Sequence, residues 1–157
     1  MILCEYMQCF EMRYRASLYL MKSDLLRHLR EEHDRWWIRY ERLYSRGAHI
    51  TGPDGPSKPQ YTPIAQEMLT RCRMHDNLFN SVMTIDLTTV QDFGNYCRRV
   101  FLEINKLKPA FADSAVSVGV FDQTVRQLRK LVMKQYQAME AHEEALAVGE
   151  PQTAKAG

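Results

Sequence analysis

Four cationic side chains in the last third of the sequence are the clearest candidates for binding chemistry. Arg126, Lys130 and Lys134 recur every four residues with Arg129 beside them, so a helix would place them on one face. No acidic residue lies within 123–139. Guanidinium and ammonium groups bind phosphate, so this face predicts contact with a polyanion. Plain solvation of the same face is an equal alternative.

Further cations would extend this face if the preceding helix packs beside it. They are Arg98, Arg99, Lys106 and Lys108. Residues 98–139 carry 8 Lys and Arg against 3 Asp and Glu, whereas residues 140–157 carry 1 against 4. The net charge of the chain is only +2, so the basic charge is concentrated in one block. Such segregation indicates a polyanion or an acidic protein as partner.

A second basic row lies in the first third of the chain. It consists of Arg35, Arg39, Arg42 and Arg46. The spacing puts all four on one helical face, where they could face phosphates. Acidic residues are frequent in 31–41, so a solvated face of mixed charge is the favoured interpretation.

Neither catalytic nor cofactor motifs occur in the sequence. It has no Walker, GxSxG or HExxH pattern. Cys72, His75 and Cys97 could supply three zinc ligands, but such partial sets are common by chance. We therefore expect a protein without enzymatic activity, cofactor or metal.

The elements that would carry these residues are predicted to be helices. Apolar spacing and start signals indicate helices over 2–21, from Ser23 to Arg46, from Pro63 to about Ile85, from Thr88 to about Leu107, and from Asp122 to about Val148. Thr88 and Gln91 have the spacing of a capping box. The glycines and prolines of 51–60 predict a loop without helix or sheet. The expected fold is mainly α-helical, a compact bundle of about four to five helices.

Two segments could instead form short strands. Valines alternate with small residues in 115–121, and apolar residues alternate with polar ones in 82–87. The run Ser81 to Thr89 followed by a helix is typical of ribbon-helix-helix DNA-binding proteins. Asp86 and the long connection after Lys108 make this the minority hypothesis.

The length of 157 residues allows one domain. We expect a single helical domain over 1–148, with a helical N-terminal part at 1–47, a Gly/Pro loop at 48–61 and a C-terminal helical unit at 62–148. Residues 149–157 are expected to form a flexible tail. No apolar run is long enough to span a membrane, and four cysteines without a CxxC pair indicate reduced thiols. The expected location is the cytoplasm, with no membrane contact.

Residues 63–101 resemble part of a poorly characterised family encoded on integrating conjugative elements and conjugative plasmids. The features that carry the resemblance are the helix led by Pro63, the pair His75-Asp76, the threonine-rich step at 84–89, the run Arg98-Arg99-Val100-Phe101, and the aromatic and basic segment His33 to Leu43. The resemblance implies a small cytoplasmic accessory protein of a mobile element, with regulation of transfer functions as its role. It carries over no binding or catalytic residue.

Two hypotheses for function follow. The first is a DNA-associated transcriptional regulator that contacts double-stranded DNA through the basic rows. The second is a non-enzymatic helical module that binds or inhibits a host or transfer-machinery protein through aromatic and methionine side chains. A second copy of the chain, forming a homodimer, is also left open.

Overall fold

Four α-helices make up most of the described chain. The structure is a computed structural model that describes residues 2–47, 51–52, 55–56 and 63–156, with side chains described over 14–45 and 63–145. The helices are α1 (Ile2–Gly47), α2 (Pro63–Met83), α3 (Phe93–Lys106) and α4 (Ala115–Ala156). Two 3-10 turns, η2 (Leu87–Thr89) and η3 (Lys108–Phe111), flank α3. The prediction of a mainly α-helical bundle is confirmed.

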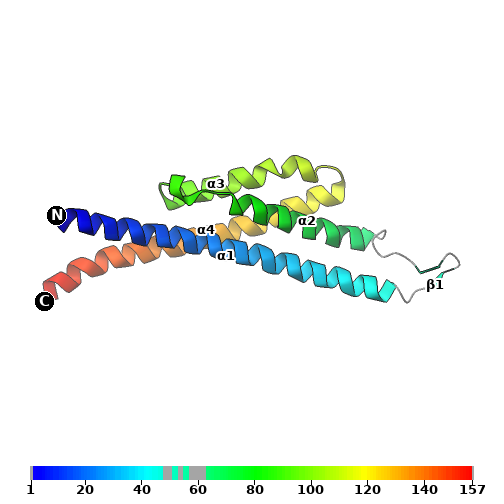
Figure 1. Cartoon of the computed structure of the whole chain (residues 1–157), viewed down its shortest axis with the longest axis horizontal. Coiled ribbons are helices and arrows are strands. Elements are labelled where there is room, and N and C mark those ends of the chain that lie inside the picture. Colours follow the sequence, from blue (N-terminus) through cyan, green and yellow to red (C-terminus); the bar gives the residue numbers. More distant parts are fainter. Residues whose placement is uncertain (1, 48–50, 53–54, 57–62, 157) are drawn as a thin grey trace.

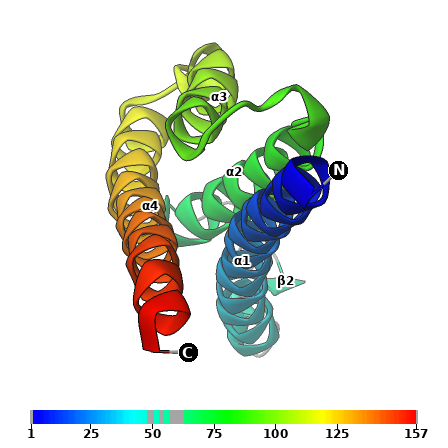
Figure 2. The same cartoon turned by 90° about the vertical axis from the view of Figure 1, so that its left-hand side faces the viewer.

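The two long helices set the shape of the molecule. The start of α1 and the end of α4 lie at the same end of the long axis (Figure 1). Seen along that axis, α1 and α4 lie on opposite sides, with α2 between them and α3 beside α4 (Figure 2). α1 packs mainly against α2, whereas α4 contacts both α2 and α3. None of the described helices is long and apolar enough to cross a membrane.

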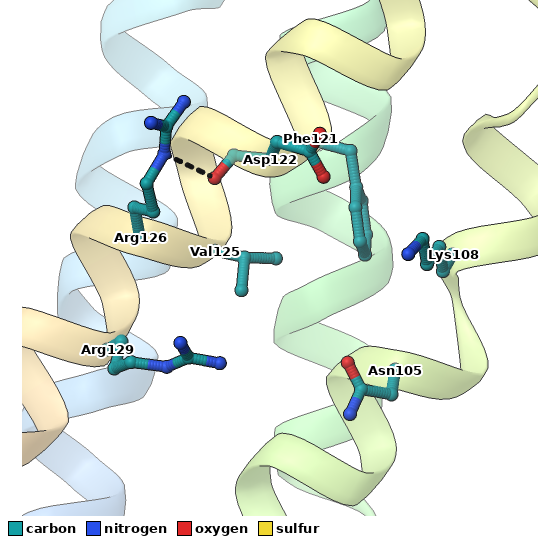
Figure 3. Close-up of a pocket in the computed structure, with 7 residues that line it drawn as sticks. All are labelled: Asn105, Lys108, Phe121, Asp122, Val125, Arg126 and Arg129. Atoms are coloured by element: carbon teal, nitrogen blue, oxygen red, sulfur yellow. Dashed lines mark hydrogen bonds between the residues drawn. The ribbon is translucent and has the colours of Figure 1, made fainter.

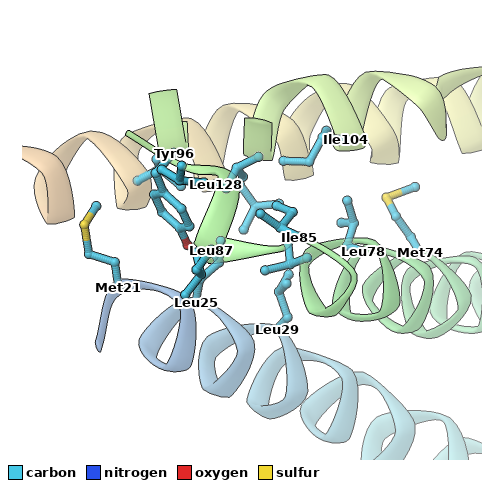
Figure 4. Packing of buried hydrophobic residues seen from close by; sticks show 14 of the residues in the cluster. Met21, Leu25, Leu29, Met74, Leu78, Ile85, Leu87, Tyr96, Ile104 and Leu128 are labelled. Atoms are coloured by element: carbon cyan, nitrogen blue, oxygen red, sulfur yellow. The ribbon is translucent and has the colours of Figure 1, made fainter. Parts of the chain in front are cut away.

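One continuous core joins the four helices. α1 contributes a stripe at helical spacing, Leu18, Met21, Leu25 and Leu29. It meets Leu78 of α2 and Leu87 of η2, with Tyr96 and Ile104 of α3 and Leu128 of α4 closing the other side (Figure 4). Burial of such side chains is the main favourable term in folding.

The N-terminal part is one helix, so the predicted pair of helices is wrong. The predicted break at Ser23 and Asp24 lies inside α1. Neither residue removes a backbone donor, and the buried stripe runs past both without interruption. The Asp24 carboxylate accepts a hydrogen bond from Arg27 at 3.0 Å instead of capping a helix.

Neither predicted strand forms. Residues 115–121 open α4, because the Ser114 hydroxyl accepts a hydrogen bond from the Ser117 backbone N–H at 3.1 Å. Residues 82–87 contain the end of α2 and a short link to η2. The alternation there is real, since Ile85 and Leu87 are buried, but no neighbouring strand pairs with them in the described chain. A ribbon-helix-helix protein needs an extended segment at 81–89, whereas residues 81–83 belong to α2 and 87–89 to η2, so this hypothesis is wrong.

Two more boundaries differ from prediction. A minimal antiparallel pair of strands, β1 (Thr51–Gly52) and β2 (Gly55–Pro56), occurs within the predicted 48–61 loop, of which positions 48–50, 53–54 and 57–61 lie outside the described residues. At the other end, α4 continues through the predicted 149–157 tail as far as Ala156. Gly149 and Pro151 in this segment are weak helix formers, so helix propensity does not explain the extension.

The cap of α3 is Asp92, four residues beyond the predicted Thr88. Thr88 instead donates a hydrogen bond from its hydroxyl to Asp86 at 2.7 Å. The Asp92 carboxylate accepts from the Asn95 backbone N–H at 2.6 Å. We expect Asp92→Ala to lower the free energy of unfolding by about 1 kcal/mol in urea titrations, because a helix N-terminal donor loses its acceptor. Asp92→Asn retains the acceptor and should change it by less than half as much; an equal loss in both variants would contradict the capping role.

Candidate nucleic-acid interface

α3 and α4 lie side by side, as the predicted extension of the basic face requires. The Arg129 guanidinium of α4 lies over the Phe101 ring of α3, at 5.4 Å from the ring centroid. Such cation–π contacts hold a guanidinium in place while its N–H groups stay available. The contact therefore fixes one basic side chain at the boundary between the two helices.

A cleft of about 420 Å³ opens beside this contact (Figure 3). α3, η3 and the first half of α4 form its walls. The residues that line it are Asn105, Lys108, Phe121, Asp122, Val125, Arg126 and Arg129. Three are cations and one is a carboxylate, so the cleft has a net charge of +2. None of the three cations forms an ion pair with another described residue, which leaves their charge available to an anion.

The lining side chains differ in direction. The Arg129 guanidinium, the Lys108 ammonium and the Asn105 amide point into the cleft (Figure 3). The Arg126 guanidinium points away from it, and its Nε donates to the Asp122 backbone carbonyl at 3.3 Å. Arg126 therefore lies at the rim, facing solvent.

The other two cations of the α4 row lie farther around the helix. Lys130 and Lys134 are exposed. At about 100° per residue, Lys134 projects about 140° away from Arg129. The four predicted cations thus cover the solvent-facing side of α4 rather than converging on one point, and only Arg126 and Arg129 line the cleft.

The predicted cations of α3 divide between two sides of that helix. Arg98 is exposed and lies two turns before Asn105, so it shares the side that borders the cleft. Arg99 faces the other flank, towards Asp86. Hydrogen bonds from Thr88 lower the pKa of the Asp86 carboxyl, and the positive charge of Arg99 lowers it further. Lys106 pairs with Glu103 at 2.9 Å.

The arginines of the α1 row form more contacts with other protein groups than the cations of α4 do. Arg35 pairs with Glu32 at 2.6 Å, and the Arg39 guanidinium lies 4.6 Å from the Trp36 ring centroid. Arg42 is exposed, and the side chain of Arg46 lies outside the described residues. This arrangement favours the interpretation of a solvated face with mixed charge.

The half-set of zinc ligands on α2 is buried rather than open. The Cys72 thiol points to the His33 carbonyl at 3.8 Å, and burial raises its pKa to about 11, which disfavours the thiolate that binds zinc. In the part of the chain that the structure describes, no three His, Cys, Asp or Glu side chains gather closely enough to hold a metal ion.

His75 is a buried histidine whose charge state affects stability. Its Nδ1 donates to the Arg71 carbonyl at 2.6 Å, and burial lowers its pKa below the ordinary value of 6.5. The unfolded chain therefore binds a proton that the folded chain does not, so stability present above pH 6.5 is lost as the pH falls below it.

We expect His75→Gln to lose less stability than the wild type between pH 7 and pH 5, measured by urea unfolding at each pH. Replacement of an exposed histidine, His142→Gln, serves as the control and should leave the wild-type pH dependence unchanged. Parallel stability curves for wild type and His75→Gln would refute the assignment.

Four lining residues of the cleft were not candidates in the sequence analysis. Asn105 lies on α3, whereas Phe121, Asp122 and Val125 lie on α4, and no motif groups them. Only the pairing of α3 with α4 brings them together.

A comparison of the chain with family models, with curated proteins and with solved structures finds no match.

Proposed function

We propose that this protein is a DNA-associated regulator that contacts the phosphates of double-stranded DNA through α4 and the adjoining edge of α3. The observation that carries the proposal is the unpaired basic surface of α4. Its solvent-facing side carries Arg126, Arg129, Lys130 and Lys134, and none of them pairs with a described carboxylate.

Two further cations extend this surface beyond one helix. Lys108 of η3 lines the cleft beside α4, and Arg98 lies on the cleft side of α3. Cations on two adjacent elements can reach several phosphates along one DNA strand. The face of a single helix reaches fewer of them. Contacts of this kind give affinity and orientation without reading the base sequence.

The biological role we propose is accessory control of transfer functions in a mobile genetic element, in the cytoplasm. Support for it is the resemblance of residues 63–101 and of His33 to Leu43 to the conjugative-element family. The charge segregation supports the DNA contact independently of that resemblance.

The test is fluorescence anisotropy with a mixed-sequence duplex across a salt series, on protein stripped of nucleic acid. Each neutralised phosphate contributes about −0.9 to the slope of log affinity against log salt, so four contacts predict a slope of about −3.6. Absence of binding at low salt would reject the proposal.

A second candidate function is a protein-interaction module. Large apolar side chains are exposed on α1, and these are Tyr19, Leu20, Trp37, Ile38 and Tyr44. Aromatic side chains are frequent in the centres of protein interfaces. Salt-tolerant capture of one protein by the wild type, lost in a Leu20→Glu and Ile38→Glu variant, would favour this candidate over the DNA contact.

A further inference from the structure

The outer face of α1 carries large apolar side chains that the rest of the described chain leaves open to solvent. Tyr19 and Leu20 are each 56% exposed, and Trp37 and Ile38 are 42% and 46% exposed. The buried stripe of α1 lies on the opposite side of the helix, where α1 packs against α2. Seen along the long axis, α1 forms one outer side of the molecule (Figure 2). Grouped apolar side chains on an outer face indicate an interaction surface.

The two apolar pairs recur at a spacing that returns to the same side of the helix. Leu20 and Ile38 are 18 residues apart, and so are Tyr19 and Trp37. At about 3.6 residues per turn this is five full turns, or about 27 Å along α1. A partner that covers both pairs at once must itself present two apolar groups at about this separation.

We propose that a second copy of this chain covers this face, with the two α1 helices packed antiparallel around a two-fold axis at the level of Leu29. Leu20 of each copy then lies opposite Ile38 of the other. Tyr19 and Trp37 share one flank of the helix, so they meet beside each of these contacts. A two-fold axis makes one surface complementary to itself, and a single apolar pair at each end of α1 is then sufficient.

The charges between the two apolar ends are complementary in the same register. Arg27 and Glu31 lie equally far from the axis, so Arg27 of each copy faces Glu31 of the other. Glu31 is exposed and forms no ion pair with another described residue. The Arg27 guanidinium donates to Asp24 at 3.0 Å and has further N–H groups for a second carboxylate. Asp24 lies opposite Asp34, but its pairing with Arg27 offsets this repulsion.

Other arrangements of the same two helices are less favourable. A shift of one helical turn in either direction places Leu20 opposite Asp34 or Glu41. A carboxylate would then lose water against an apolar side chain without gaining a partner. A parallel pair would set Arg27 against Arg27 and Glu31 against Glu31, which is repulsive. The antiparallel register centred on Leu29 joins apolar with apolar and cation with anion.

The proposal rests on the second candidate function, for which it names the partner, and not on the duplex contact. Its apolar contacts are confined to the two ends of the paired segment. We therefore expect a weak dimer, with a dissociation constant of about 1–100 μM.

The first test is sedimentation velocity of the full chain from about 1 to 200 μM, with no DNA present. We expect a shift from monomer to dimer across this range. Leu20→Glu should weaken dimerisation at least about tenfold, because it places a carboxylate in both apolar contacts. Leu102→Glu is the matched control, since Leu102 is 52% exposed on α3, and it should leave dimerisation within about twofold. Both replaced side chains are exposed, so both variants should keep wild-type helicity in circular dichroism.

The second test is disulfide trapping, which reports the register. A mixture of Leu20→Cys and Ile38→Cys proteins should form a disulfide-linked pair under mild oxidation, because the two positions face each other between copies. Either variant alone should give no more cross-link than the wild type, since equivalent positions lie about 27 Å apart in this dimer. The wild-type sample accounts for the native cysteines.

Several results would overturn the dimer. They are a wild-type monomer at the highest concentration, equal dimerisation of Leu20→Glu and wild type, an equal loss in Leu102→Glu, or a cross-link as strong in one variant alone as in the mixture. A monomer that binds a different protein through Leu20 and Ile38 would retain the interaction module and reject the dimer. A dimer that binds no duplex would retain this contact and reject only the regulator.

Discussion

Reversal of all four α4 cations to glutamate is expected to abolish duplex binding. The residues are Arg126, Arg129, Lys130 and Lys134, all exposed. Each phosphate contact is a charge-assisted hydrogen bond worth about 1.5 kcal/mol, so loss of four costs about 6 kcal/mol and lowers affinity by a factor of about ten thousand or more. The new carboxylates also repel the backbone. Anisotropy titration at low salt measures the loss.

The control for this reversal is the arginine row of α1. Arg35, Arg39 and Arg42 are also exposed, but Glu32 and the Trp36 ring engage the first two. Their reversal should change duplex affinity only weakly. Both variants should keep wild-type helicity, because all the altered residues are exposed and none belongs to the buried core. Unchanged affinity after the α4 reversal, or an equal loss after the α1 reversal, would refute the assigned interface.

Truncation of Leu78 is expected to give the largest loss of stability from a single substitution among those considered. Its side chain is fully buried on α2, close to Leu29 of α1 and Ile85 of the following link (Figure 4). Leu78→Ala removes buried methyl groups and leaves a cavity at the junction of several elements. The expected decrease in the free energy of unfolding is about 2–5 kcal/mol, measured by urea titration.

Ile64→Ala is the matched control on the same helix. Ile64 is 61% exposed, so its truncation should cost less than about 0.5 kcal/mol. A cost below about 1 kcal/mol for Leu78→Ala would show that the core does not depend on this junction. The difference between the two variants isolates burial from helix propensity, which is similar for both changes.

Helical periodicity was the most reliable guide to the fold. The start of α2 at Pro63 and the inner stripe of α4 agree with prediction, since Leu128 and Val132 are buried and Val125, Tyr136 and Met139 pack against the core. These features depend on the local order of residues. A proline tolerated only in the first helical turn and an apolar side chain every three or four residues are both visible in a linear chain.

Local sequence signals predicted the wrong structure where a segment could adopt more than one conformation. Ser23 and Asp24 can start a helix, but they can also lie inside one, and the buried stripe of α1 decided for the second. The valines of 115–121 can form a strand, but no strand among the described residues pairs with them and the Ser114 cap favours a helix. In the first case long-range packing selected between conformations of similar local energy, and in the second a local cap favoured the helix.

In the candidate site, too, some features were visible in the sequence and others only in the tertiary structure. Composition and spacing alone identified the cations at 126–134. They also indicated that further cations before this segment would join the same basic face only if the two helices pack side by side. Only the tertiary structure decided that Arg129 and Lys108 enter one cleft, that Arg99 faces another flank, and that Phe121 forms a wall of that cleft. The sequence by itself determined which helices carry charge, because charge and periodicity are local properties. The tertiary structure decided which charges meet, because that depends on the turn through η3 that places α3 against α4.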